Sequence, residues 1–277
     1  MGSERSSVAD KRRSFRRLHE SGCFVLPNPW DLGSARFLQQ LGFKALASTS
    51  AGFAWTQAAA DGAVSLGGVL AHLQALVGAT DLPVNADFQN GFAAEAAGVA
   101  ENVRAAVATG IAGLSIEDAS GDGAQPLYPL SSAIERIRAA RGAIDASGED
   151  VMLVGRAECF LTGHPDPLNE SLKRLKAYAQ AGADCLFAPG ARSREQIAAI
   201  VQAVAPKPVN VLVPSPVDFT LSDLEKIGVR RVSVGSALAG AAWGGFLRAA
   251  RGLAEGRFDG FADNATYPEL NGLFGQS

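Results

Sequence analysis

The sequence is poor in charge, in cysteine and in histidine, and these shortages exclude several classes of function. Charged residues make up 19% of the 277 residues, the formal net charge is −3, and both signs are interspersed. This balance argues against binding to nucleic acid or to a membrane surface. The three cysteines, Cys23, Cys159 and Cys185, are far apart and odd in number, so we expect reduced thiols and no disulfide framework.

Long apolar runs are also lacking. No segment approaches the roughly 20 consecutive apolar residues that a membrane span requires. Residues 1–17 are polar and charged, without the apolar stretch of an export signal. We therefore expect a cytoplasmic protein. The basic cluster within residues 11–17 is expected on a helix, as a solvated or subunit-contact face.

Short apolar, β-rich runs alternate with helix-length periodic stretches through nearly the whole chain. The eight predicted strands are residues 23–26, 44–48, 83–87, 112–117, 151–155, 184–188, 208–212 and 231–235. Helical periodicity is clearest over residues 93–109, 131–147, 168–181, 193–204 and 221–227. Glycines 42, 110, 182 and 228 follow expected helix ends, where a left-handed residue closes a helix before the next strand.

Eight such units predict a closed (β/α)₈ barrel of the TIM type, as one domain over residues 1–277. An open doubly wound sheet is the second choice. A Rossmann-type nucleotide site is not expected, because no predicted strand is followed by a glycine-rich phosphate loop of the required spacing. Extra helices are expected at the N-terminus and, beyond the barrel, at residues 236–255 and 267–274. The C-terminal pair would either cap the barrel or reach a neighbouring subunit.

Polar side chains gather where the predicted strands end, which in a barrel is the rim that holds the active site. They are Asn28, Asp31, Thr49, Ser50, Asp61, Asp87, Gln89, Glu117, Arg156, Glu158 and Asn210. Oxygen ligands dominate this set, and the three histidines lie in helix or loop contexts. The set therefore suits Mg²⁺ or Mn²⁺ better than zinc.

The order of motifs resembles the isocitrate lyase / phosphoenolpyruvate mutase superfamily. The matching segments are residues 29–36, 48–52, 61–62, 86–92, 116–118, 155–158 and 181–184, and the resemblance spans roughly residues 26–238. It implies a Mg²⁺-dependent enzyme that binds a 2-oxo or enolate-forming acid and makes or breaks the adjoining bond. It also implies a homo-oligomer, a dimer or a tetramer, in which C-terminal helices of about 236–277 are exchanged between subunits.

The resemblance assigns roles residue by residue. Asp87 is similar to the carboxylate nearest the metal, and Glu117 to a second, water-mediated metal carboxylate. Asp61 resembles the loop acid that anchors metal waters or substrate, and Arg156 the arginine that pairs with substrate oxygens. The segment that resembles the substrate-carboxylate loop comprises Thr49, Ser50, Ala51 and Gly52.

Two departures from the family pattern matter. Gln89 stands where the family commonly has a second acid, so water-mediated metal binding there should be weakened but not abolished. The loop over residues 118–126 lacks the Lys-Lys-Cys-Gly-His signature whose cysteine serves as acid/base in isocitrate and methylisocitrate lyases. Isocitrate cleavage is therefore not expected.

The leading hypothesis is a Mg²⁺- or Mn²⁺-dependent enzyme on a small 2-oxo or 2-hydroxy acid, acting through a metal-stabilised enolate as a carbon–carbon lyase. Alternatives are oxaloacetate decarboxylation or hydrolysis, P–C bond chemistry on phosphonopyruvate, and a non-catalytic 2-oxo acid-binding barrel. Catalytic candidates are Arg156, Glu158 and Asp61. For the general acid or base, Glu158 is the first candidate and Asp122 the weaker one.

Structural roles compete with these assignments. Arg156 would also suit an ion pair with Glu158 or Glu117, and Thr49 and Ser50 would also suit helix capping. Asn210 interrupts an apolar strand, which favours an inward, substrate-side position.

Overall fold

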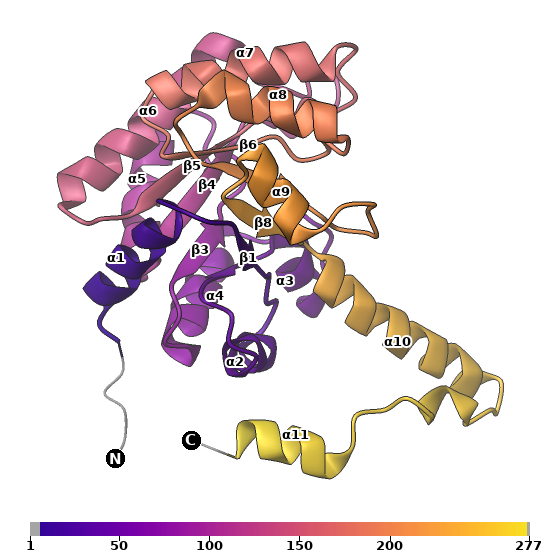
Figure 1. Ribbon diagram of the computed structural model, residues 1–277. Coiled ribbons are helices and arrows are strands. Elements are labelled where there is room, and N and C mark those ends of the chain that lie inside the picture. The colour runs from indigo at the N-terminus through magenta and orange to yellow at the C-terminus, as the bar shows by residue number, and fades with distance from the viewer. Residues whose placement is uncertain (1–5, 276–277) are drawn as a thin grey trace.

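The computed structural model describes residues 6–275 and contains the predicted eight-stranded parallel barrel (Figure 1). The strands are β1 (Phe24–Leu26), β2 (Leu46–Ala47), β3 (Val84–Asp87), β4 (Gly113–Glu117), β5 (Met152–Arg156), β6 (Cys185–Phe187), β7 (Val209–Leu212) and β8 (Arg231–Ser233). Their order is β1-β8-β7-β6-β5-β4-β3-β2. The backbone N–H of Ala47 donates to the Pro27 carbonyl at 3.0 Å, which joins β2 to the end of β1 and nearly closes the barrel.

Helices surround the strands, and most begin or end within a few residues of the predicted bounds. They are α1 (Val8–Leu18), α2 (Leu32–Gln40), α3 (Ser50–Thr56), α4 (Leu66–Ala79), α5 (Ala96–Ala108), α6 (Leu130–Ser147), α7 (Pro167–Gln180), α8 (Arg194–Val204), α9 (Leu221–Ile227), α10 (Ala237–Ala254), η1 (Asp259–Phe261) and α11 (Tyr267–Phe274). The glycines at the joints, residues 42, 110, 182 and 228, all have positive φ, as predicted. Helix α3, which has seven residues, was not predicted.

Helix α1 lies across the N-terminal ends of the strands. Phe15 is fully buried with inward-facing residues such as Met152 and Cys185. The expectation of a solvated basic face was wrong for Lys11 and Arg12, which are buried. Lys11 donates to the carbonyls of Val77 and Thr80, and Arg12 donates to those of Val107 and Ile111. These cations therefore satisfy backbone carbonyls in the last turns of α4 and α5 and in the residues just beyond them.

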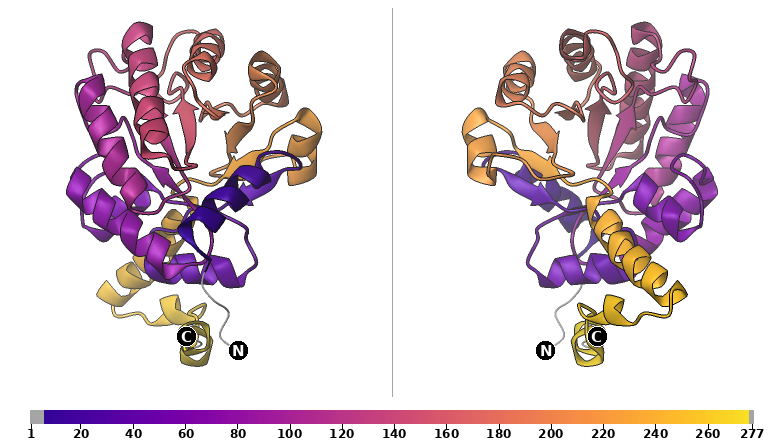
Figure 2. Two further views of the ribbon diagram at one scale, coloured as in Figure 1. Left: turned by 90° about the vertical axis from the view of Figure 1, so that its left-hand side faces the viewer. Right: turned by 90° about the vertical axis from the view of Figure 1, so that its right-hand side faces the viewer.

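The C-terminal elements leave the barrel. Helix α10 projects away from it, and η1 and α11 turn back beneath α2 (Figures 1 and 2). Gln40 of α2 donates to the Leu273 carbonyl at 2.7 Å. Large apolar side chains on this arm are exposed, among them Phe258 at 70% and Tyr267 at 85%. In the part of the chain that is described, no helix is both long and apolar enough to cross a membrane.

Candidate active site

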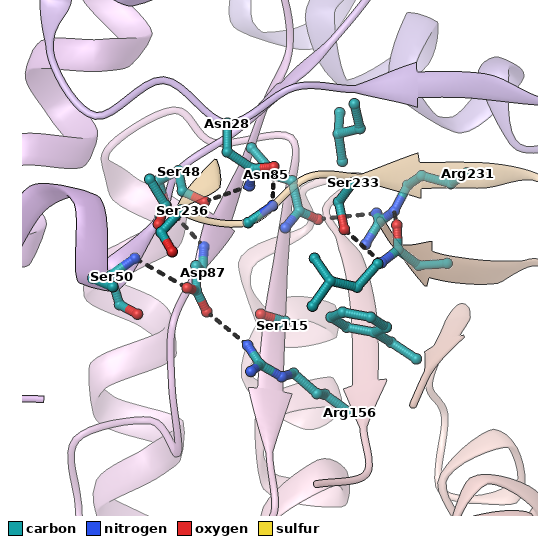
Figure 3. A pocket seen from close by; sticks show the side chains of 18 of the residues that line it. Asn28, Ser48, Ser50, Asn85, Asp87, Ser115, Arg156, Arg231, Ser233 and Ser236 are labelled. Atoms are coloured by element: carbon teal, nitrogen blue, oxygen red, sulfur yellow. Dashed lines mark hydrogen bonds and ion pairs between the residues drawn. The ribbon is translucent and has the colours of Figure 1, made fainter. Parts of the chain in front are cut away.

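A cavity of about 160 Å³ opens at the C-terminal ends of the strands (Figure 3). Most of its lining residues are polar, and they come from all eight strands and from segments that follow them. Its polar lining residues are Asn28, Ser48, Thr49, Ser50, Asp61, Asn85, Asp87, Ser115, Arg156, Asn210, Arg231, Ser233 and Ser236. The wall is completed by apolar side chains, including Leu26, Phe187 and Leu212.

Arg156 is the charged centre of this cavity. It ends β5, and the register of β4 against β5 places it directly beside Glu117. Its Nη1 lies 3.2 Å from Glu117 and 3.3 Å from Asp87, while its Nε donates to Glu158. The guanidinium also lies over the Phe187 ring, 5.3 Å from its centroid. The ion pairs expected as an alternative role for Arg156 are therefore present, and they hold it at the edge of the cavity.

Three carboxylates share this single guanidinium, so negative charge is in excess there when all three are ionised. Burial raises the pKa of Glu117 to about 8, with the charges of Glu158 and Asp87 adding to the effect and Arg156 opposing it. Burial also raises the pKa of Glu158, again against Arg156. Apart from Arg156, no cation of residues 6–275 lies within 4.0 Å of any of these carboxylates.

Asp87 connects the charged centre to the segment after β2. The backbone N–H of Ser50 donates to its carboxylate at 3.0 Å, and its own N–H donates to the Ser48 hydroxyl at 2.9 Å. The Thr49 hydroxyl accepts from the Gly52 N–H and caps α3, which is the capping role considered as an alternative. Ser50 belongs to the segment that resembles the substrate-carboxylate loop, and its N–H is here taken by Asp87.

The other members of the predicted loop differ in position. Ala51 lines the cavity, but Gly52 does not. Gly52 lies against Trp30 and Ala239, where an added Cβ would come within 3.0 Å and 3.2 Å of their Cβ atoms. Its place in the sequence is therefore explained by close packing of α3.

Asp61 and Gln89 meet beside the cavity. The Gln89 amide lies 3.4 Å from the Asp61 carboxylate, with the amide nitrogen as donor. Asp61 lines the cavity, whereas Gln89 and Glu117 lie outside its immediate wall. Gln89 has φ of +45°, a left-handed conformation that turns the chain sharply after β3.

The donor chemistry fits a divalent cation. Asp61, Asp87 and Glu117 supply only carboxylate oxygens, and the excess negative charge around Arg156 would be balanced by a dication. Within residues 6–275, no three acidic, cysteine or histidine side chains are gathered closely enough to hold an ion by themselves. Such an arrangement suits Mg²⁺, which commonly keeps several of its waters in protein sites.

Glu158 is fixed by a buried network that the sequence did not indicate. Its backbone N–H donates to Asp118 at 2.8 Å, and Asp118 is only 2% exposed. The same carboxylate accepts from Arg174 at 3.0 Å and from the Tyr178 hydroxyl. Glu158 itself does not line the cavity, and Asp122, the weaker acid/base candidate, is exposed and caps the N–H of Ala124.

On the far side of the cavity, Asn210 points inward as predicted. It accepts from Arg231 Nε at 2.8 Å and donates to the Ser233 hydroxyl at 2.9 Å. Arg231 and Asn85 were not among the predicted site residues. The alternation of Arg231 and Ser233 with the outward Val232 was a usable signal, since period two places both polar side chains on one face.

Comparisons with known proteins identify the family of the chain. Residues 15–254 match the family model for phosphoenolpyruvate phosphomutase. A crystal structure from Burkholderia cenocepacia J2315, provisionally assigned as a lyase or mutase, is 42% identical with a TM-score of 0.93, and the match covers 97% of each chain. An uncharacterised protein of Mycobacterium tuberculosis strain H37Rv is 34% identical over 88% of this chain and 90% of its own.

A further solved structure is that of 2,3-dimethylmalate lyase, described as a member of the PEP mutase/isocitrate lyase superfamily. It is 26% identical with a TM-score of 0.84, over 98% of this chain and 95% of the lyase. The chain therefore belongs to the phosphoenolpyruvate phosphomutase family, within the isocitrate lyase / phosphoenolpyruvate mutase superfamily that its motifs predict.

Proposed function

We propose that this chain is a Mg²⁺-dependent enzyme that cleaves a carbon–carbon bond of a small 2-oxo or 2-hydroxy carboxylic acid. The observation that carries the proposal is the placement of Asp87, Glu117 and Glu158 around the one guanidinium of Arg156, beside a polar cavity. The likeness to 2,3-dimethylmalate lyase supports it, because that relative is a lyase of a 2-hydroxy diacid.

The residues that would hold the cation are Asp87 and, through water, Glu117 and Asp61. When bound, a divalent cation supplies Lewis acidity, which lowers the free energy of the enolate left by bond cleavage. The excess negative charge described above favours its binding. Gln89 adds an amide where an acid would add a charge, so the affinity for the cation is moderate.

Arg156 binds the oxygens of the substrate with the part of its guanidinium fork that faces the cavity. Asp87, Glu117, Glu158 and the Phe187 ring hold the group in one orientation, so little freedom is lost when substrate binds. The interaction between the positively charged guanidinium and the substrate oxygens becomes stronger as negative charge develops on those oxygens. We assign Glu158 to positioning, since it lies behind Arg156.

Asp61 is the carboxylate that both lines the cavity and is exposed to solvent. It is the candidate that can exchange a proton with water while facing the substrate. Substrate would sit between Asp61 and Arg156, with Asn210 on the opposite wall. Decarboxylation or hydrolysis of oxaloacetate and P–C chemistry would use the same charged centre, so the products decide between these reactions.

The proposal is tested by incubating the protein with a panel of 2-oxo and 2-hydroxy mono- and diacids, with Mg²⁺ or with EDTA, and identifying products by NMR. We expect Mg²⁺-dependent cleavage of a carbon–carbon bond in at least one diacid. Release of CO₂, or of oxalate and acetate, from oxaloacetate would assign one of the alternatives instead, as would release of phosphate from phosphonopyruvate added to the panel. Binding without turnover of any acid would support the non-catalytic barrel.

The charge of Asp87 is tested in the same assay. Asp87→Ala removes the carboxylate, and Asp87→Asn keeps an acceptor for the Ser50 N–H while removing the charge. Both variants should lose about 10–100-fold or more in cation affinity and turnover. Asp145→Ala, which removes a carboxylate of α6 that pairs with Arg141 at 2.8 Å, is the matched control and should retain activity. No calorimetric binding of Mg²⁺ or Mn²⁺, with or without oxalate, would contradict the metal assignment.

A further inference from the structure

The side of the cavity formed by β8 carries a positive charge that no acidic side chain balances. Arg231 is the first residue of β8, lines the cavity and is 2% exposed. Its Nε donates to the Asn210 carbonyl oxygen at 2.8 Å and its Nη1 to that of Asn85 at 3.3 Å. Both partners are neutral amides. Within residues 6–275, Nη2 makes no hydrogen bond and no carboxylate lies within 4.0 Å of the guanidinium.

The contrast with Arg156 is marked. Figure 3 shows both side chains directed into the same space, Arg156 from β5 and Arg231 from β8. Arg156 meets three carboxylates, whereas Arg231 meets none. The two sides of the cavity therefore differ: three carboxylates surround one guanidinium where a cation fits, and on the other side a guanidinium has no carboxylate partner.

An unbalanced buried cation costs free energy, and a bound anion would recover it. Burial lowers the pKa of Arg231, but an arginine side chain keeps its charge in proteins. Asn210 is itself fixed by donating to the Ser233 hydroxyl, so the guanidinium is held before any ligand arrives. A preformed guanidinium with a free N–H edge is suited to a carboxylate.

We propose that Arg231 binds a second carboxylate of the substrate and makes the cavity selective for dicarboxylic over monocarboxylic acids. The inference rests on the proposed function, because the first carboxylate and the adjoining oxygen are taken to lie on the Arg156 side. Asn85 and Asn210 are positioning residues in this arrangement. They orient the guanidinium through their amide oxygens without neutralising it.

The test compares two ligands that differ only at the second anionic group. Malate has a carboxylate where 2-hydroxybutyrate has a methyl group, and the two have the same chain length. Affinities are measured by calorimetry with Mg²⁺ present, for the unmodified protein and for Arg231→Met and Arg231→Lys. Arg136→Lys is the matched control, since Arg136 is equally buried and donates only to backbone carbonyls away from the cavity.

We expect the unmodified protein to bind malate about tenfold or more tightly than 2-hydroxybutyrate. Arg231→Met should abolish this preference while leaving the affinity for 2-hydroxybutyrate within about threefold. Arg231→Lys should retain part of it, and Arg136→Lys all of it. If circular dichroism shows that Arg231→Met does not fold, the partial loss in Arg231→Lys decides.

Equal binding of the two acids, or a preference that survives both Arg231 variants, would overturn the inference and leave the proposed function standing. A different result is that neither the unmodified protein nor any variant binds either acid in the presence of Mg²⁺. It would overturn the proposed function and the inference together.

Discussion

Arg156 is the one positive charge shared by three carboxylates of the site. Its replacement by lysine tests directly whether the planar, forked guanidinium is required. A lysine keeps the positive charge but cannot face three carboxylates and a substrate at once. We expect Arg156→Lys to weaken oxalate binding in Mg²⁺ by about 2 kcal/mol or more. Isothermal calorimetry measures this, and an unchanged affinity would contradict the proposed role of Arg156.

Glu117 should make the stability of the metal-free protein depend on pH. Its pKa is raised from 4.5 to about 8 in the folded chain, first by burial. Between these two values the folded chain holds a proton that the unfolded chain has released, so stability falls as pH rises through this window. Below it both states are protonated and there is no penalty. The loss should reach the order of a few kcal/mol.

Urea unfolding in EDTA, from about pH 4 to about pH 9, measures this dependence. Glu117→Gln cannot ionise, so its free energy of unfolding should fall less across the window than that of the unmodified protein. Glu158, whose pKa is also raised, remains in both proteins, so any dependence on pH that persists in Glu117→Gln includes its contribution. Parallel pH profiles for the two proteins would show that Glu117 does not titrate in this range.

At the scale of elements, the loop after β4 separates this chain from cysteine-dependent relatives. Residues 118–126 contain no cysteine, and their polar groups mostly bond within the loop. Cys159 and Cys185 are buried, and Cys23 is half-buried with its pKa raised by burial to about 11. None is a reactive thiolate near the cavity.

Activity on the true substrate should therefore survive iodoacetamide, and isocitrate should release negligible glyoxylate. Both are read from a standard assay, with mass spectrometry to count alkylated thiols. Efficient isocitrate cleavage would overturn this expectation. So would complete inactivation by alkylation of Cys23 while the circular dichroism spectrum stays unchanged.

For the whole molecule, the C-terminal arm predicts assembly. Helix α10, η1 and α11 expose Phe246, Phe258, Phe261, Tyr267 and Phe274, more apolar surface than an isolated arm should leave in water. A second copy of the chain is the expected cover, as the family resemblance implies. Light scattering at micromolar concentration should give a dimeric or tetrameric mass. Truncation after residue 236 should lower that mass, and a monomeric full-length chain would refute the prediction.

The sequence by itself determined the alternation of strands and helices and the residues that end the strands. Buried parallel strands must be apolar along their length, and the glycines at residues 42, 110, 182 and 228 mark where helices close, so these signals are local. Because all parallel strands end at one rim, listing their last polar residues was enough to bring Asp87, Glu117 and Arg156 together.

Only the tertiary structure decided which groups pair. The register of β4 against β5 sets Glu117 beside Arg156, and the docking of α1 buries Lys11 and Arg12 against carbonyls that lie far along the chain. Arg231 is the clearest case. It has no counter-charge because the neighbouring strands β3 and β7 bring the amides of Asn85 and Asn210 to it, and no carboxylate. The sequence around Arg231 describes β8 alone. It cannot show which side chains of other strands lie beside the guanidinium.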